Sequence, residues 1–129
     1  MCGIAGFWRN ASDRSADWLE EIASKMANTL FHRGPDDSGT WVNEEAGVAF
    51  GHRRLSIIDT SDAGHQPMIS ADRRYVITYN GEVYNFQKLR QELEKKGHRF
   101  RGHSDTEVML AAFVQWGVEV SVKKFNGMF

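Results

Sequence analysis

The sequence predicts an α+β domain, and three observations carry this prediction. Short apolar segments bounded by turn residues are spread over the first 80 positions and are typical of strands. One segment near the start and two in the last third have apolar residues at helical spacing. Strands followed by helices favour a sheet that helices cover on one or both faces. Because the chain ends directly after residues 125–129, we expect its remaining strands to be missing and the domain to be truncated at the C-terminus.

The first predicted elements are a strand and a helix. Residues 4–8 are apolar and lie among glycines, which indicates a buried strand with Cys2 at its tip. An amphipathic helix is expected over residues 16–31, after the capping candidates Ser15 and Asp17. Its core-facing residues are predicted to be Trp18, Leu19, Ile22, Met26 and Leu30.

More strands and two more helices are predicted further along. The strand candidates are residues 39–42, 48–52, 55–58 and 74–79, which should form antiparallel pairs. Asn85 can cap a helix that runs to about residue 96, where Gly97 stops it. Residues 104–107 (SDTE) fit a capping box that opens a third helix, and Gly117 should end this helix.

Composition indicates one ordinary domain over residues 1–129, with 41% hydrophobic and 26% charged residues. The 16 basic and 17 acidic residues are interspersed and give a net charge of -1, which argues against a nucleic-acid partner. There is no run of 18 apolar residues and no signal peptide at the start, so we expect no membrane association and a cytoplasmic protein. One cysteine cannot form an intramolecular disulfide.

That single cysteine, Cys2, is the most informative residue. If Met1 is removed, Cys2 carries its thiol and a free α-amine on the same residue. A free thiol has a pKa of about 8.5 and is only slightly ionised at neutral pH, whereas an α-amine with a pKa of about 7.7–8.0 can accept its proton. Cys2 would then be a nucleophile with its own base. The alternative is that Cys2 is a small buried hydrophobe.

Six short segments in one order give the chain a family resemblance. They are residues 1–6 (MCGIAG), 32–37 (HRGPDD), 51–59 (GHRRLSIID), 66–67 (QP), 79–85 (YNGEVYN) and 104–107 (SDTE). Together they resemble the glutaminase domain of glutamine-hydrolysing asparagine synthetases, which are class II glutamine amidotransferases. The resemblance spans the chain and implies the four-layer α-β-β-α fold of N-terminal-nucleophile hydrolases. It also implies that residues 1–129 are part of this domain and that a C-terminal synthetase domain is absent.

Hydrolysis of a side-chain amide by a thiolate creates an oxyanion, which needs two aimed hydrogen-bond donors. The Asn80 side-chain amide and the Gly81 backbone N–H can supply both, and the resemblance assigns them this role beside the nucleophile Cys2. An Asn-Gly pair between apolar runs also predicts a type I′ hairpin turn. The two interpretations are compatible.

Glutamine must also be held by its charged ends. Arg54 can bind the α-carboxylate through two hydrogen bonds, and Asp105 and Glu82 can bind the α-ammonium. On the sequence alone, Arg54 fits a surface residue and Asp105 an acid at a helix N-terminus, but the resemblance favours substrate binding. Arg54 is preferred to Arg53 because it directly precedes the Leu-Ser-Ile run. The resemblance places along the pocket, chiefly through backbone groups, Leu55, Ser56, Ile57 and Ile58.

No metal or cofactor is expected in this chain. The five histidines show no metal-ligand spacing, and His32 is expected to be structural. No phosphate-binding loop occurs, so ATP and magnesium are implied only for the absent synthetase domain, which would use the ammonia to amidate aspartate. The expected partners are L-glutamine and that domain, and a homodimer is kept open.

Three other interpretations remain open from the sequence. The released ammonia could serve another acceptor, in a sugar or natural-product pathway. If Met1 is retained, the α-amine of Cys2 is blocked and the chain fits a non-catalytic glutamine-binding module. If Cys2 serves only packing, the chain is a structural α+β domain.

Overall fold

The computed structural model describes residues 1–9, 14–57 and 59–129, and its contacts divide the chain into two compact units. Unit 1 consists of Met1–Ser56, His65–Pro67 and Thr78–Asn80. Unit 2 consists of Ile57–Gly64, Met68–Ile77 and Gly81–Phe129. Both units contain antiparallel strands, and helices occur in both, so the predicted α+β class is confirmed.

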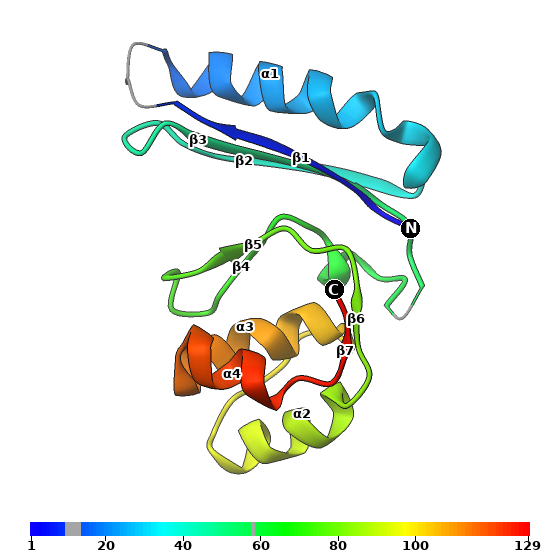
Figure 1. Cartoon of the computed structure of the whole chain (residues 1–129), viewed down its shortest axis with the longest axis vertical. Helices are drawn as coiled ribbons and strands as arrows, with labels where there is room; N and C mark the ends of the chain where they lie inside the picture. Colours follow the sequence, from blue (N-terminus) through cyan, green and yellow to red (C-terminus); the bar gives the residue numbers. More distant parts are fainter. Residues whose placement is uncertain (10–13, 58) are drawn as a thin grey trace. The chain divides into compact units, whose positions relative to one another are not determined.

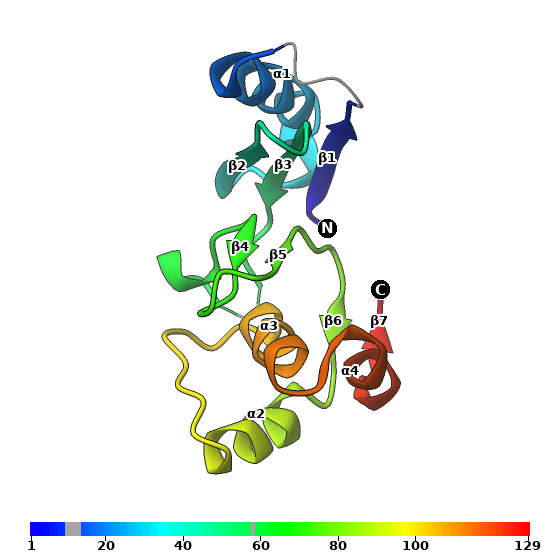
Figure 2. The same ribbon diagram turned by 90° about the vertical axis from the view of Figure 1, so that its left-hand side faces the viewer.

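Unit 1 is built on a three-stranded antiparallel sheet. Its strands are β1 (Gly3–Trp8), β2 (Asp37–Asn43) and β3 (Val48–Arg54), with β3 in the centre (Figure 2). The three strands predicted here are confirmed, and each extends beyond its expected range. Gly3 of β1 lies opposite Arg53 of β3, so the pairing brings Cys2 to the end of the central strand.

Helix α1 (Ala16–Asn28) covers one face of this sheet (Figure 1). The Ser15 side chain caps it by accepting a hydrogen bond from the Trp18 N–H, as predicted. A Cβ at Gly51 of β3 would lie 2.7 Å from the Ala23 carbonyl oxygen, so the helix backbone comes close to the central strand there. The odd-numbered residues of β3 therefore face α1, and the even-numbered ones face away from it.

The expectation for this helix needs two corrections. It ends at Asn28 instead of residue 31, and the short helix η1 (Phe31–Arg33) follows. Its fully buried residues are Leu19, Ala23 and Ala27, whereas the predicted core residues other than Leu19 are half-buried. Small side chains are buried because the helix packs so closely on Gly51.

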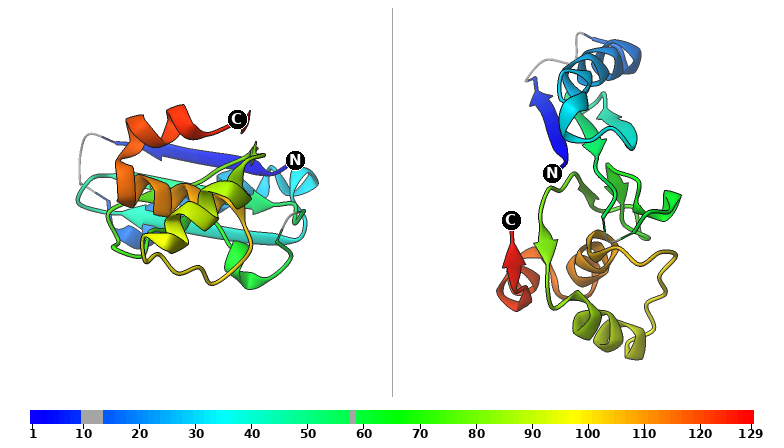
Figure 3. Two further views of the ribbon diagram at one scale, coloured as in Figure 1. Left: turned by 90° about the horizontal axis from the view of Figure 1, so that it is seen from below. Right: turned by 90° about the vertical axis from the view of Figure 1, so that its right-hand side faces the viewer.

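Unit 2 contains three helices and short strand pairs among its described residues. The helices are α2 (Phe86–Lys95), α3 (Asp105–Trp116) and α4 (Val118–Lys124). The strand pairs are β4 (Met68–Ile69) with β5 (Val76–Ile77) and β6 (Glu82–Val83) with β7 (Gly127–Met128), and a short helix η2 spans Asp62–Gly64. Helices α2 and α3 lie side by side (Figure 3). Gly97 and Gly117, which follow them, have the positive φ angles of helix stops, as predicted.

One predicted strand is absent from its described residues, and another is much shorter than predicted. Residues 55–57 form no strand, because the Leu55 backbone bonds the Cys2 sulfur and the Ser56 N–H bonds the Asp36 carboxylate; Ile58 lies outside the described residues. Within residues 74–79, only Val76–Ile77 pairs in a sheet. Tertiary side-chain contacts take the backbone groups that a sheet would otherwise use.

Asn85 occupies the N-cap position of α2 but does not cap the helix with its side chain. Its amide nitrogen donates to the Lys124 carbonyl, and its amide oxygen accepts from the Asn126 N–H. The expectation of a side-chain cap is therefore wrong. Asn85 instead ties the start of α2 to the segment that leads into β7.

The cap of α3 gives a test of this fold. Ser104 is buried, and its hydroxyl accepts from the Glu107 N–H at 3.2 Å. We expect Ser104→Ala to lower the free energy of unfolding by about 1–2 kcal/mol, because the half-buried Glu107 N–H loses its acceptor. Urea denaturation measures this change. Ser24→Ala removes a hydroxyl from the interior of α1 and should leave stability equal or slightly higher; equal losses in both variants would contradict the capping role.

Candidate active site

The Cys2 thiol is held by the backbone of one residue. The Leu55 N–H donates to the Cys2 sulfur at 3.4 Å, and the Leu55 carbonyl oxygen accepts from the thiol at 3.7 Å. Leu55 directly follows β3, and Cys2 directly precedes β1. The pairing of β1 with β3 brings these two strand ends together. The half-buried thiol is thus oriented by backbone groups that the sheet positions.

Residues 32–37 reinforce this end of the sheet. The Arg33 Nε donates to the Cys2 carbonyl oxygen at 3.1 Å. The Asp36 N–H donates to the Arg54 carbonyl oxygen, and its carboxylate accepts from the Ser56 N–H at 2.8 Å. This segment therefore fixes both Cys2 and the chain that follows β3. His32 is exposed.

Arg53 and Arg54 point to opposite faces of the sheet because they are neighbours on one strand. The Arg53 Nε donates to the Gly34 carbonyl oxygen at 3.0 Å, and its guanidinium lies 4.7 Å from the centre of the Phe31 ring. Arg53 is thereby occupied in holding the loop after α1. Arg54 is also buried and faces away from α1, on the face that carries His52.

The chain before Asn80 is fixed by two side chains of unit 1. The Tyr79 N–H donates to the Gln66 Oε1 at 2.6 Å, and the Tyr79 carbonyl oxygen lies 3.2 Å from the His52 Nε2. Asn80 follows directly and is half-buried. The expected hairpin is wrong, because the strands on either side of Asn80 and Gly81 pair elsewhere: β5 pairs with β4, and β6 pairs with β7.

In unit 2, Asp105 ties the first turn of α3 to β6. One carboxylate oxygen accepts from the Val83 N–H at 2.8 Å, and the other accepts from the Thr106 N–H at 2.8 Å. Glu82 precedes Val83 in β6, and Gly81 precedes the strand, so the three predicted unit 2 residues with polar roles lie at one place. Asp105 is buried, yet a carboxylate with two accepted bonds retains lone pairs for a ligand.

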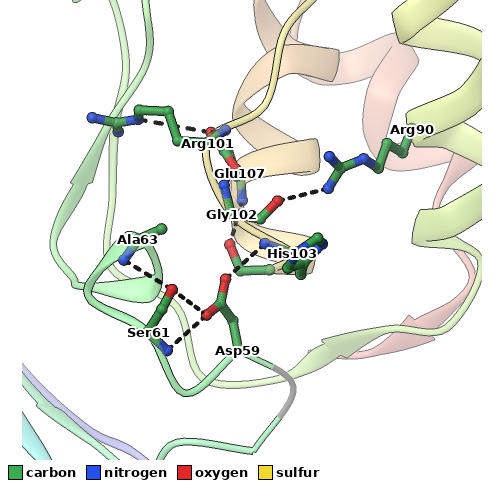
Figure 4. A network of polar contacts seen from close by, with 9 residues as sticks. Asp59, Ser61, Ala63, Arg90, Arg101, Gly102, His103 and Glu107 are labelled. Atoms are coloured by element: carbon green, nitrogen blue, oxygen red, sulfur yellow. Dashed lines mark hydrogen bonds and ion pairs between the residues drawn. The ribbon is translucent and has the colours of Figure 1, made fainter.

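Two further carboxylates hold the loop that leads to Asp105 (Figure 4). The Glu107 carboxylate accepts from the Arg101 and Gly102 N–H groups, at 2.8 and 3.0 Å. The Asp59 carboxylate accepts from the His103 N–H at 2.7 Å and also from Ser61. Three successive backbone N–H groups thus bond side-chain carboxylates. The start of α3 is therefore held firmly.

The predicted site residues are divided between the two units. Unit 1 holds Cys2, Arg54, Leu55, Ser56 and Asn80, and unit 2 holds Ile57, Gly81, Glu82 and Asp105. Ile57 is exposed. Ile58 lies outside the described residues.

Within residues 1–9, 14–57 and 59–129, no three His, Cys, Asp or Glu side chains gather in a way that could hold a metal ion. No helix in the same residues is long and apolar enough to cross a membrane.

Comparison with known families identifies the chain. The model of the glutamine amidotransferase domain family matches residues 1–129. The chain belongs to this family. It is 45% identical over 130 residues to asparagine synthetase [glutamine-hydrolyzing] 1 of Bacillus subtilis, and 37% identical over 129 residues to asparagine synthetase [glutamine-hydrolyzing] 1 of Arabidopsis thaliana. These alignments cover 100% of the chain but only 20% and 21% of the relatives.

The predicted membership in the glutamine amidotransferase family is therefore confirmed. The chain spans about one fifth of the length of the relatives named here. The relatives are asparagine synthetases, and the chain matches only part of each. This agrees with the interpretation of the chain as an N-terminal part of an asparagine synthetase.

Several residues that support the predicted site residues were not predicted from the sequence. They are Arg33, Asp36, His52 and Gln66, which bond backbone groups of predicted site residues or of their neighbours. All four belong to the short segments that carried the resemblance. Their presence there was the available signal, but their bonding partners lie 13 to 31 positions away in the chain.

The burial of His52 predicts that the stability of the chain depends on pH. Burial lowers the pKa of His52 below 6.5, and the Tyr79 carbonyl and Asp37 oppose this shift while Arg54 and His65 add to it. In the unfolded chain, histidine has a pKa of about 6.5. Below that pH the unfolded state binds more protons than the folded state, so stability falls as pH decreases toward the folded pKa of His52.

We therefore expect the free energy of unfolding to decrease as pH is lowered from about 6.5, and His52→Gln to remove this contribution because glutamine does not titrate. Urea denaturation at a series of pH values measures the slope. His32→Gln, at an exposed position, is the control and should keep the slope of the unmodified chain. An unchanged slope in His52→Gln would assign the effect to other groups.

Proposed function

We propose that this chain hydrolyses the side-chain amide of L-glutamine. The single observation that supports this most is the family match over residues 1–129, which includes the lone cysteine at position 2. After removal of Met1, the α-amine of Cys2 takes the thiol proton and the sulfur attacks the amide carbon. The tetrahedral oxyanion collapses, the C–N bond breaks, and ammonia leaves with the proton. Water then hydrolyses the thioester to glutamate and restores the thiol.

The oxyanion is assigned to two donors, the Asn80 side-chain amide and the Gly81 backbone N–H. Asn80 directly follows Tyr79, whose N–H and carbonyl oxygen are both bonded by side chains. This fixed backbone supports the role of Asn80. A donor that is already oriented stabilises the transition state without reorganisation. The Leu55 N–H and carbonyl support the orientation of the thiol in the same way.

The charged ends of glutamine are assigned to Arg54 for the α-carboxylate and to Asp105 with Glu82 for the α-ammonium. Arg53 bonds Gly34 and lies over Phe31 on the α1 face of β3, whereas Arg54 lies on the opposite face, and this difference in position supports the choice of Arg54. The anchored carboxylate of Asp105 suits a fixed cation site. Pocket contacts through backbone groups are assigned to Leu55, Ser56, Ile57 and Ile58.

We further propose that the ammonia serves asparagine synthesis, because the relatives named above are asparagine synthetases. Amidation of aspartate with ATP and magnesium would take place in a C-terminal synthetase domain, and no cofactor is assigned to this chain. The fold is proposed to be the four-layer α-β-β-α fold. A cytoplasmic location, a homodimer and the absence of a nucleic-acid partner stay predictions, and another ammonia acceptor is the alternative.

The nucleophile is tested by Cys2→Ser in the full-length protein. We expect loss of glutamine-dependent ammonia release, with an unchanged urea midpoint, because a hydroxyl ionises far less readily than a thiol. Intact mass should show that Met1 is absent. A retained Met1 together with glutamine binding but no hydrolysis would favour the binding module, and full activity of Cys2→Ser would exclude the thioester.

The two neighbouring arginines give a matched test of substrate binding. Arg54→Lys should raise KM for glutamine by roughly tenfold or more and change kcat less, because lysine cannot form the paired hydrogen bonds to a carboxylate. Arg53→Lys should instead lower the free energy of unfolding by about 1 kcal/mol through loss of the Gly34 bond, with KM nearly unchanged. Steady-state kinetics on both variants shows which arginine binds the α-carboxylate of glutamine. The reverse pattern would assign this role to Arg53.

A further inference from the structure

His52 has an unusual environment for a polar side chain. It lies on the central strand β3, and its exposed fraction is 0%. Its Nε2 is 3.2 Å from the Tyr79 carbonyl oxygen, whereas its Nδ1 is buried without a hydrogen-bond partner among the described residues. A buried polar atom without a partner lowers stability. Because this arrangement is unfavourable for stability, we look for a role of the one hydrogen bond in function.

The geometry assigns the hydrogen of the imidazole. A carbonyl oxygen can only accept, so the ring nitrogen beside it, Nε2, must carry the hydrogen. Nδ1 then holds the lone pair of a neutral ring. Burial lowers the pKa of His52, which favours this neutral form. The Nε2 hydrogen is therefore used for the Tyr79 carbonyl oxygen.

The bonded carbonyl belongs to the peptide group that joins Tyr79 to Asn80. The preceding peptide group is bonded too, since the Tyr79 N–H donates to the Gln66 Oε1 at 2.6 Å. Two side chains thus fix both peptide planes around Tyr79. Because the plane before a residue sets the starting direction of its backbone, the orientation of the Asn80 side chain depends on the His52 hydrogen bond.

We propose that His52 is a positioning residue for glutamine hydrolysis, whose Nε2–H holds the Tyr79–Asn80 peptide group and thereby aims the Asn80 amide at the oxyanion. This inference rests on the proposed function of Asn80. His52 does not touch the substrate. His52 contributes to the rate of hydrolysis only by keeping the Asn80 amide accurately placed. A small displacement of a catalytic donor lowers the rate strongly.

The test compares His52→Leu with His52→Gln in the full-length protein. His52→Leu removes the donor, so kcat for glutamine hydrolysis should fall by about tenfold to a hundredfold with KM within about twofold, since an oxyanion donor acts mainly after the carbonyl becomes tetrahedral. His52→Gln offers an amide N–H to Tyr79 and should recover kcat to within about fivefold of the unmodified enzyme. His32→Leu, at an exposed site, should leave both constants unchanged. Circular dichroism and urea midpoints establish that each variant is folded.

A double-mutant cycle with Asn80→Ala separates this inference from the proposed function. Asn80→Ala alone should lower kcat by roughly 10²–10³, and adding His52→Leu should then change kcat less than about twofold, because the amide that His52 aims is gone. If the two losses multiply, or if His52→Leu keeps full kcat while Asn80→Ala does not, the inference is overturned and the role of Asn80 stands. If Asn80→Ala keeps full kcat, the oxyanion assignment itself fails.

If His52→Leu does not fold, His52→Asn takes its place, because the shorter asparagine amide cannot reach the Tyr79 carbonyl.

Discussion

The contact between the Cys2 sulfur and the Leu55 backbone is the constraint on which unit 1 depends. Chain termini are usually the least ordered part of a domain, yet the proposed nucleophile at position 2 has to be held in place. The chain meets this requirement by pairing β1 with the central strand and by giving Leu55 both a donor and an acceptor for the thiol. Arg33 adds a bond to the Cys2 carbonyl. The sheet, the loop after α1 and the segment after β3 all converge on this one residue.

Side chains that bond the backbone do much of the positioning in both units. Asp36 bonds the chain after β3, and His52 and Gln66 bond the chain before Asn80. In unit 2, Asp59 and Glu107 bond the loop before Asp105. These segments are irregular, but the backbone groups named here are satisfied by specific side-chain partners. Irregular backbone held in this way can present groups to a substrate that a regular strand would use for pairing.

Strand geometry separates the roles of two identical neighbours. Arg53 faces the α1 side and is used for structure, whereas Arg54 faces the other side together with His52. The two differ only in the alternation of a strand, since both are buried and both are arginine. In the sequence they stand side by side in one motif, and nothing in that motif shows which of them faces α1. Only the register of β3 between β1 and β2 separates them.

The sequence by itself determined those features whose cause is local. Periodicity, capping and backbone freedom within a few residues predict strands β1, β2 and β3, the helices capped by Ser15 and Ser104, and the helix stops at Gly97 and Gly117. The tertiary structure alone decided that residues 55–57 form no strand, that Asn80 and Gly81 form no hairpin, and that Asn85 binds residues 124 and 126. In each of these cases a backbone or side-chain group is satisfied by a partner distant in the chain. Such pairings depend on which strands and loops come together in space, and that information is absent from any short stretch of sequence.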